Sequence, residues 1–240
     1  MKRLAEKKIL EWKDSPRRKP LIIRGARQVG KTWLVDNFLA KKFDSFVKID
    51  LEKRRDIHAY FDGNLDPKTI LPYLELETER IIPGKTLLFL DEIQACPRAI
   101  MALRYFYEQM PELHIIAAGS MLEFAFGDIS IPVGRVQYLY MHPMNFHEYL
   151  LAIGKEQMAE FALKSPVDID EKIQKMILHE LRNYFFIGGM PECVKTYRDS
   201  GSVVQCLKLL RSNRKLSPRI LMISRNIVPI STQHVSMQSF

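Results

Sequence analysis

Residues 21–40, LIIRGARQVGKTWLVDNFLA, change from a short apolar run, through a turn with two glycines, to a run with helical spacing. The opening residues are typical of a buried strand, and Trp33, Val35, Phe38 and Leu39 recur at the intervals of a helix. Between them, GARQVGKT fits the pattern G-x-x-x-x-G-K-[ST] in the strand-to-helix setting that the pattern requires. The sequence therefore predicts a strand, a tight loop and a helix in direct succession.

The predicted loop has the features of a phosphate site. Its glycines let successive backbone N–H groups point inward, and the positive end of the following helix adds to the attraction for an anion. We expect Lys31 to reach the β- and γ-phosphates of a nucleotide and the Thr32 hydroxyl to bind Mg²⁺. The predicted nucleotide-binding residues are Gly25, Ala26, Arg27, Gln28, Val29, Gly30, Lys31 and Thr32. The alternative is a glycine turn that joins strand to helix and binds nothing.

A second apolar strand, TLLFLDEIQ at residues 86–94, leads into two adjacent carboxylates. A run buried on both faces is typical of a parallel sheet, in which ligands bind at the carboxyl ends of the strands. We expect Asp91 to hold Mg²⁺ through water and Glu92 to be the base that orients the attacking water. The second acid favours hydrolysis, because a small-molecule kinase takes its nucleophile from the acceptor. Alternatively, the pair only ends the strand and caps the next helix.

Three more strands are predicted at SFVKIDLEK (45–53), LHIIAAGSML (113–122) and GRVQYLYMH (134–142). Their alternation with helices predicts an α/β fold with a parallel sheet covered by helices on both faces. Ser120 ends the second of these strands and is a candidate catalytic sensor of the γ-phosphate, or else a cap. Arg135 opens the third and is a candidate for contact with the phosphates of its own site or a neighbour's. The alternative for Arg135 is a solvated or salt-bridged arginine.

The second half of the chain reads as helical. Asn145 is suited to cap a helix over NFHEYLLAIG, and residues 168–188 carry apolar side chains at three- and four-residue steps before two glycines. This pattern predicts a small helical lid. The expected domains are a P-loop domain at 1–142, the lid at 143–206 and an atypical basic tail at 207–240.

The composition limits the classes of protein to consider. With 240 residues, of which 47% are hydrophobic, the chain can form a proper core. It has no run of about 18 apolar residues, and its first residues are charged where a signal peptide would be apolar. We therefore expect a soluble, cytoplasmic chain with no membrane association. The three cysteines are scattered and indicate neither a disulfide framework nor a zinc site.

The net charge of +8 is concentrated at the two ends of the chain. Residues 1–20 carry a net +5 and residues 200–240 a net +6, which leaves −3 for residues 21–199. Contact with DNA would therefore depend on the termini. Solvated ends are the commoner explanation of such runs.

Five stretches stand in an order that resembles one family of prokaryotic AAA-type P-loop ATPases: GARQVGKT, LLFLDEIQ, AAGSMLE, GRVQYLYMHPMNFHEYL and FIGGMPECV. This family pairs the ATPase with a poorly characterised, nuclease-like C-terminal domain. The resemblance covers about residues 1–205 and implies an ASCE-type fold, ATP as the nucleotide, and Asp91 with Glu92 in catalysis. Past about Leu210 the chain departs from the family and the C-terminal domain is missing. We therefore expect a truncated or frame-shifted product with a disordered tail.

The function expected from these features is Mg²⁺-dependent ATP hydrolysis coupled to movement of the lid. One alternative is a nucleotide-gated binding switch with negligible turnover, which also needs Lys31 but does not need Glu92. A second is a DNA-associated protein that uses its basic ends. Expected partners are ATP, an unidentified protein, and a second copy of the chain in a homo-oligomer.

Overall fold

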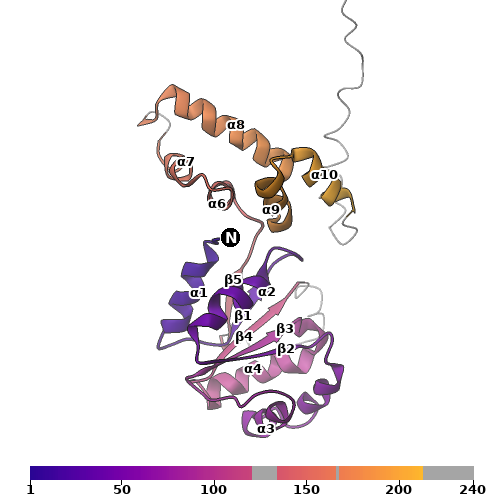
Figure 1. Cartoon of the computed structure of the whole chain (residues 1–240). Coiled ribbons are helices and arrows are strands. Elements are labelled where there is room, and N and C mark those ends of the chain that lie inside the picture. The colour runs from indigo at the N-terminus through magenta and orange to yellow at the C-terminus, as the bar shows by residue number, and fades with distance from the viewer. Residues whose placement is uncertain (121–133, 166–167, 213–240) are drawn as a thin grey trace, which may run out of the picture. The chain divides into compact units, whose positions relative to one another are not determined.

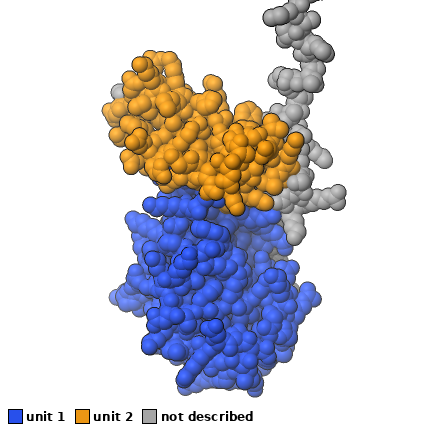
Figure 2. Space-filling model, in the orientation of Figure 1, with its two compact units in different colours: residues 1–148 blue, residues 149–240 orange. Residues whose placement is uncertain are grey.

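The computed structural model describes residues 1–120, 134–165 and 168–212. The chain divides into two compact units, residues 1–148 and residues 149–240, which Figure 2 shows in blue and orange. Unit 1 contains the sheet, and the regular elements described in unit 2 are all helices. The division falls after Glu148, a few residues beyond the end that we predicted for the first domain, and the three-domain division stays a prediction.

Unit 1 is built on a five-stranded sheet with the order β2-β3-β4-β1-β5. The strands are β1 (Leu21–Arg24), β2 (Ser45–Asp50), β3 (Thr86–Asp91), β4 (His114–Gly119) and β5 (Gln137–Tyr140). Each described pairing between neighbours is parallel. The parallel α/β sheet predicted from the alternation of strands and helices is confirmed.

The register brings the carboxyl ends of the strands to one edge of the sheet. Arg24, the last residue of β1, pairs with Gly119 at the end of β4 and with Tyr140 at the end of β5. Asp50 pairs with Asp91 at the ends of β2 and β3. The segments that follow these strands therefore begin at the same edge, where ligands bind in open α/β sheets.

Helices cover both faces of the sheet, with α1 and α2 over one face and α3 and α4 over the other (Figure 1). Their bounds are α1 (Ala5–Asp14), α2 (Lys31–Trp33), α3 (Pro67–Glu77) and α4 (Pro97–Gln109). Shorter helical segments are a π-helix at Leu34–Leu39 and 3-10 helices at Ala40–Lys42, Arg55–Phe61 and Ile93–Ala95. Alternate strand residues point to opposite faces, and Ile22, Leu88 and Leu90 join Ile70 and Leu103 in one buried cluster.

The helix predicted after the loop forms, but its apolar face differs from the predicted one. The π-helical stretch Leu34–Leu39 continues α2 and widens the repeat, so that Leu34, Val35 and Leu39 are buried. Trp33, which the helical spacing placed on the apolar face, is 44% exposed.

The regular elements described in unit 2 are helices. They are α6 (Phe146–Ala152), which begins in unit 1, α7 (Glu156–Phe161), α8 (Glu171–Ile187), α9 (Pro191–Ser200) and α10 (Val203–Ser212). Asn145 caps α6 as predicted, because its Oδ1 accepts from the backbone N–H of Glu148 at 2.8 Å and its own N–H donates back to Glu148 Oε2 at 3.1 Å. None of the helices in the described residues is long and apolar enough to cross a membrane.

Two expectations for this half need correction. Phe185, one of the apolar residues that recur at helical steps over 168–188, is 68% exposed, because only a narrow strip of α8 packs against α9 and α10. Residues 207–212, assigned to the atypical tail, belong to α10, where Leu210 is buried and Cys206 donates to the carbonyl of Cys193. The remainder of the predicted tail lies outside the described residues.

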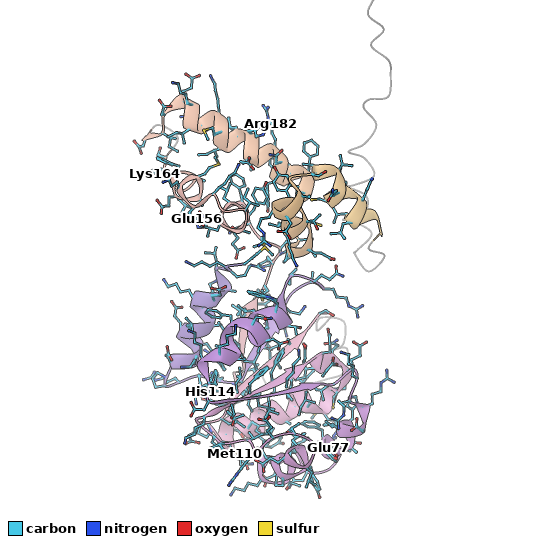
Figure 3. The ribbon with its side chains drawn as sticks, in the orientation of Figure 1. Glu77, Met110, His114, Glu156, Lys164 and Arg182 are labelled. Carbon is cyan, nitrogen blue, oxygen red and sulfur yellow. The ribbon has the colours of Figure 1, made fainter. Side chains whose placement is uncertain are left out.

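His114 is a buried titratable residue of the sheet, and we expect it to make the fold sensitive to acid. It is the buried first residue of β4 (Figure 3), and its ring packs edge-on against Trp12 and Phe43. Burial, reinforced by the positive charge of Arg18, lowers the pKa of His114 to about 4. The histidine pKa in the unfolded chain is near 6.5. As the pH falls from about 6.5 to about 4, His114 is therefore protonated in the unfolded chain but stays neutral in the folded chain, and the free energy of unfolding decreases.

We expect His114→Phe to reduce the loss of stability in mild acid. Above about pH 6.5 His114 is neutral in both states and costs the wild type nothing. From pH 7.5 to pH 5, the unfolding free energy of the variant should therefore rise by about 1–2 kcal/mol relative to that of the wild type. Denaturant unfolding at the two pH values measures this difference. His179→Gln, at an exposed histidine of α8, is the control. An equal loss in wild type and His114→Phe would show that another group causes the acid sensitivity.

Candidate functional site

The loop between β1 and α2 has the backbone that its glycines predict. Gly25 has a φ of +152° and Gly30 a φ of +95°, and the intervening Gln28 also lies at a positive φ of 66°. A Cβ on Gly25 would overlap the backbone carbonyl oxygen of Met141, which follows β5. The loop is thus packed directly on the end of β5, where the N–H of Met141 donates to the carbonyl of Arg24 at 2.7 Å.

Gly25→Ala is expected to displace the loop and to weaken the predicted nucleotide binding by roughly ten-fold or more. The added methyl group would overlap backbone atoms of Met141, which cannot move aside by a rotamer change as a side chain can. The variant should therefore also lose about 1–3 kcal/mol of stability. Gly63→Ala is the matched control, because nothing lies within 4 Å of a Cβ built there. Titration with ADP and thermal unfolding of both variants test the prediction. Unchanged affinity in Gly25→Ala would mean that the loop does not need this geometry.

Lys31 lies folded into the loop and is only 7% exposed. Its Nζ donates to the carbonyl oxygens of Gly25 and Ala26, each at 2.9 Å. Burial lowers the pKa of Lys31, and the nearby carboxylates of Glu92 and Asp91 oppose this effect. The structure thus places the ammonium inside the loop, where it can exchange the two carbonyls for phosphate oxygens.

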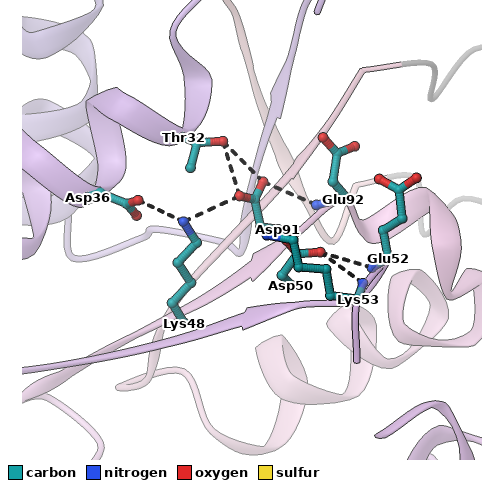
Figure 4. A network of polar contacts seen from close by, with 8 residues as sticks. All are labelled: Thr32, Asp36, Lys48, Asp50, Glu52, Lys53, Asp91 and Glu92. Atoms are coloured by element: carbon teal, nitrogen blue, oxygen red, sulfur yellow. Dashed lines mark hydrogen bonds and ion pairs between the residues drawn. The ribbon is translucent and has the colours of Figure 1, made fainter. Parts of the chain in front are cut away.

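Thr32 and Asp91 come together across the edge of the sheet (Figure 4). The Thr32 hydroxyl donates to Asp91 Oδ2 at 3.1 Å, and Oδ1 lies 3.4 Å away. Burial raises the pKa of Asp91, while the hydrogen bond from Thr32 and the charge of Lys48 lower it. A hydroxyl beside a carboxylate is an oxygen donor set suited to Mg²⁺.

No group of three or more His, Cys, Asp or Glu side chains in the described residues has the arrangement of a metal site. Mg²⁺ at a nucleotide takes one or two protein ligands and completes its shell with phosphates and water. Thr32 and Asp91 would supply the protein side of such a shell.

Lys48 is a charged residue at this site that the sequence analysis missed. Its Nζ lies 2.7 Å from Asp36 Oδ2 and 3.6 Å from Asp91 Oδ2. The signal was the lysine between the apolar residues of the strand SFVKID, two residues before Asp50, which pairs with Asp91. Lys48 therefore keeps a positive charge beside Asp91.

Glu92 has a strained backbone at the position where a base is predicted. Its φ of 50° is in the left-handed region, which is unfavourable for a residue other than glycine. Residues held in such strained conformations cluster at functional sites. Its N–H donates to Asp91 Oδ1 at 3.1 Å, and its Oε2 accepts from Gln94 Nε2 at 2.5 Å. The turn thus separates the two carboxylates and gives each its own hydrogen-bond partners.

The other two predicted catalytic residues differ in their placement. Ser120 follows β4, and its Oγ accepts from Arg27 Nε of the loop at 3.3 Å. Arg135 precedes β5, whose first residue pairs with the first residue of β1, so it lies at the amino edge of the sheet, away from the loop. There it forms an ion pair with Glu108 at 2.8 Å, which is the salt-bridged alternative. The structure thus does not bring Arg135 to the predicted phosphate loop.

Arg3 is a second charged residue whose place at the loop was not predicted, because the charges of residues 1–20 were expected to be solvated. Its side chain is buried, and its Nη1 donates to the carbonyl oxygen of Val29 in the loop at 2.7 Å. Arg3 also lines a cavity of about 300 Å³ together with Met141 and Glu148. Nothing in the local spacing of the sequence distinguishes it from its basic neighbours.

Comparison with known proteins adds one family and several distant structures. A family model described as an AAA domain matches residues 17–150. No curated protein matches the chain.

Among solved structures, two mutants of RuvB from Thermotoga maritima share 13% and 14% identity with this chain. Their TM-scores are 0.48 and 0.46, and the alignments cover 92% of this chain and 68% and 67% of theirs. A chain of Drosophila ORC, in a structure bound to DNA, shares 13% identity with a TM-score of 0.43. That alignment covers 90% of this chain and 62% of the ORC chain, so the chain spans less than two thirds of the ORC chain's length.

Proposed function

The chain belongs to the AAA-domain family whose model matches residues 17–150, more than half of its length, and from this premise we propose that it is an Mg²⁺-dependent ATPase. The observation that carries the proposal is the convergence of Lys31, Thr32, Asp91 and Glu92 at the carboxyl edge of the parallel sheet. These residues come from two separate motifs, and a loop that bound nothing would not need an acid pair beside it.

The proposed roles follow from the geometry of the site. The N–H groups of residues 25–32 and the Lys31 ammonium bind the phosphates, which are thereby held in line for attack. Thr32 and Asp91 hold Mg²⁺, which supplies charge neutralisation on the phosphate oxygens when bound. Glu92 accepts a proton from the attacking water.

Arg27 and Ser120 are further proposed contacts at the γ-phosphate end of the site. Their side chains already meet at 3.3 Å, so Ser120 can respond to a change in the position of Arg27. We propose that this pair reports whether the nucleotide is intact. A contact of Arg135 with the site of a neighbouring chain in an oligomer also stays a proposal, since its side chain is 46% exposed.

The helical residues 143–206 are proposed to act as a lid that responds to the nucleotide. A homo-oligomer, an unidentified protein partner, and DNA contact through the basic ends are proposals of the same standing. The matched family model covers the AAA domain alone.

Release of phosphate from ATP and from GTP by the purified chain, with and without Mg²⁺, tests the proposal. We expect Mg²⁺-dependent release from ATP. Tight binding of ATP with no release would favour the nucleotide-gated switch. Absence of binding to either nucleotide would overturn the proposed function.

A further inference from the structure

Arg3 connects three segments of unit 1 next to the phosphate loop. Besides the bond from Nη1 to Val29, its Nη2 donates to the carbonyl oxygen of His142 at 2.8 Å and its Nε to Glu148 Oε1 at 3.0 Å. These acceptors lie in the loop, in the segment after β5 and in α6. A planar guanidinium presents its donors in a fixed fork, so a single side chain holds all three acceptors at once.

The position of Arg3 is itself fixed by its partner. The side chains of Arg3 and Glu148 are 7% and 6% exposed, so the ion pair is shielded from water. Glu148 also accepts from the N–H of Leu4 at 2.8 Å and from the N–H of Asn145 at 3.1 Å. Because both carboxylate oxygens of Glu148 accept hydrogen bonds, the carboxylate is fixed and holds the guanidinium in one orientation.

The hydrogen bond from Arg3 to the Val29 carbonyl also affects the direction of the Gly30 N–H group. The carbonyl of Val29 and the N–H of Gly30 belong to one peptide unit, which is planar and trans, so the two groups point in opposite directions. A donor that holds the carbonyl on one side therefore directs the N–H to the other side. Gly30 has no Cβ and a φ of +95°, so its own residue type restrains this peptide little.

We propose that Arg3 is a positioning residue, which aims the Gly30 N–H at the bound phosphates by holding the Val29 carbonyl. The proposal rests on the proposed function, since it needs a nucleotide in the loop. Arg3 does not touch the nucleotide in this role. It acts through the Val29–Gly30 peptide, and Glu148 acts through Arg3.

Two variants separate this role from a merely structural one. Arg3→Lys keeps the charge but offers a single point donor that cannot serve three acceptors. The double variant Arg3→Met with Glu148→Gln removes both charges, so no unpaired ion is left buried and the fold is preserved. Lys7→Met, at an exposed position of α1, is the control.

The experiment is a titration of each full-length variant with Mg²⁺ and ADP, combined with thermal unfolding and the NMR shift of the Gly30 amide. We expect both Arg3 variants to bind ADP about ten-fold more weakly or worse. The shift of the Gly30 amide on ADP binding should shrink in the same variants, and the double variant should melt close to the wild type.

Wild-type ADP affinity together with a wild-type Gly30 shift in both Arg3 variants would overturn the positioning role and leave the proposed function intact. If the fraction of unfolded protein in each variant fully accounted for its weaker ADP binding, the positioning role would also be overturned. Failure of the wild type itself to bind ADP would refute the proposed function, and the positioning role with it.

Discussion

Glu92→Gln is expected to lower ATP turnover by about 10²- to 10⁴-fold while ATP affinity changes little. The amide has the size of the carboxylate and can still accept from Gln94, whose Nε2 lies 2.5 Å from Glu92 Oε2. It cannot accept a proton from the attacking water. Phosphate release in the steady state measures the first quantity, and equilibrium titration with ATP measures the second.

The matched control for this prediction is Glu52→Gln. Glu52 is an exposed carboxylate in the segment after β2, and its replacement changes the net charge by the same amount (Figure 4). Turnover should stay at the wild-type level in this control. If Glu92→Gln also kept wild-type turnover, the base would have to be another group. If the wild type bound ATP without turnover, the nucleotide-gated switch would be the better account.

Much of the fold is predictable from the sequence because the deciding signals are local. The loop requires glycine at Gly25, where a Cβ would meet the Met141 carbonyl, and at Gly30, where φ is +95°. The apolar runs of β3 and β4 predict buried parallel strands, and both are buried from end to end. The carboxyl ends of parallel strands meet at one edge of the sheet. Asp91 at the end of β3 therefore lies beside Thr32, which follows the loop after β1.

The residues that escaped prediction have partners far away in the chain. Arg3 and Glu148 are 145 residues apart, and no periodicity within a short window relates them. Lys48 reaches Asp91 from a neighbouring strand, so its role depends on a register that one strand alone does not reveal. The widened turn at Leu34–Leu39 is likewise invisible to a helical repeat, which is why the apolar face of that helix differed from the prediction.

Lys31→Ala is expected to abolish measurable nucleotide binding without destabilising the unliganded protein. Burial lowers the pKa of Lys31, which means that the fold disfavours the charged ammonium relative to water. Removing the ammonium relieves this effect and loses the two hydrogen bonds to the carbonyls of Gly25 and Ala26. We expect these contributions to offset each other to within about 1 kcal/mol.

Thermal unfolding with and without Mg²⁺ and ADP separates the two consequences of Lys31→Ala. At a ligand concentration 100 times the dissociation constant, binding stabilises the wild type by about 2.7 kcal/mol, or about 5–10 °C in Tm. The variant should melt near the unliganded wild type and gain nothing from the nucleotide. Lys41→Ala, at an exposed lysine outside the loop, should keep the full gain. A lower Tm in unliganded Lys31→Ala would show that the lysine holds the loop together, whereas an unaltered Tm would show that the relieved burial and the two lost hydrogen bonds offset each other.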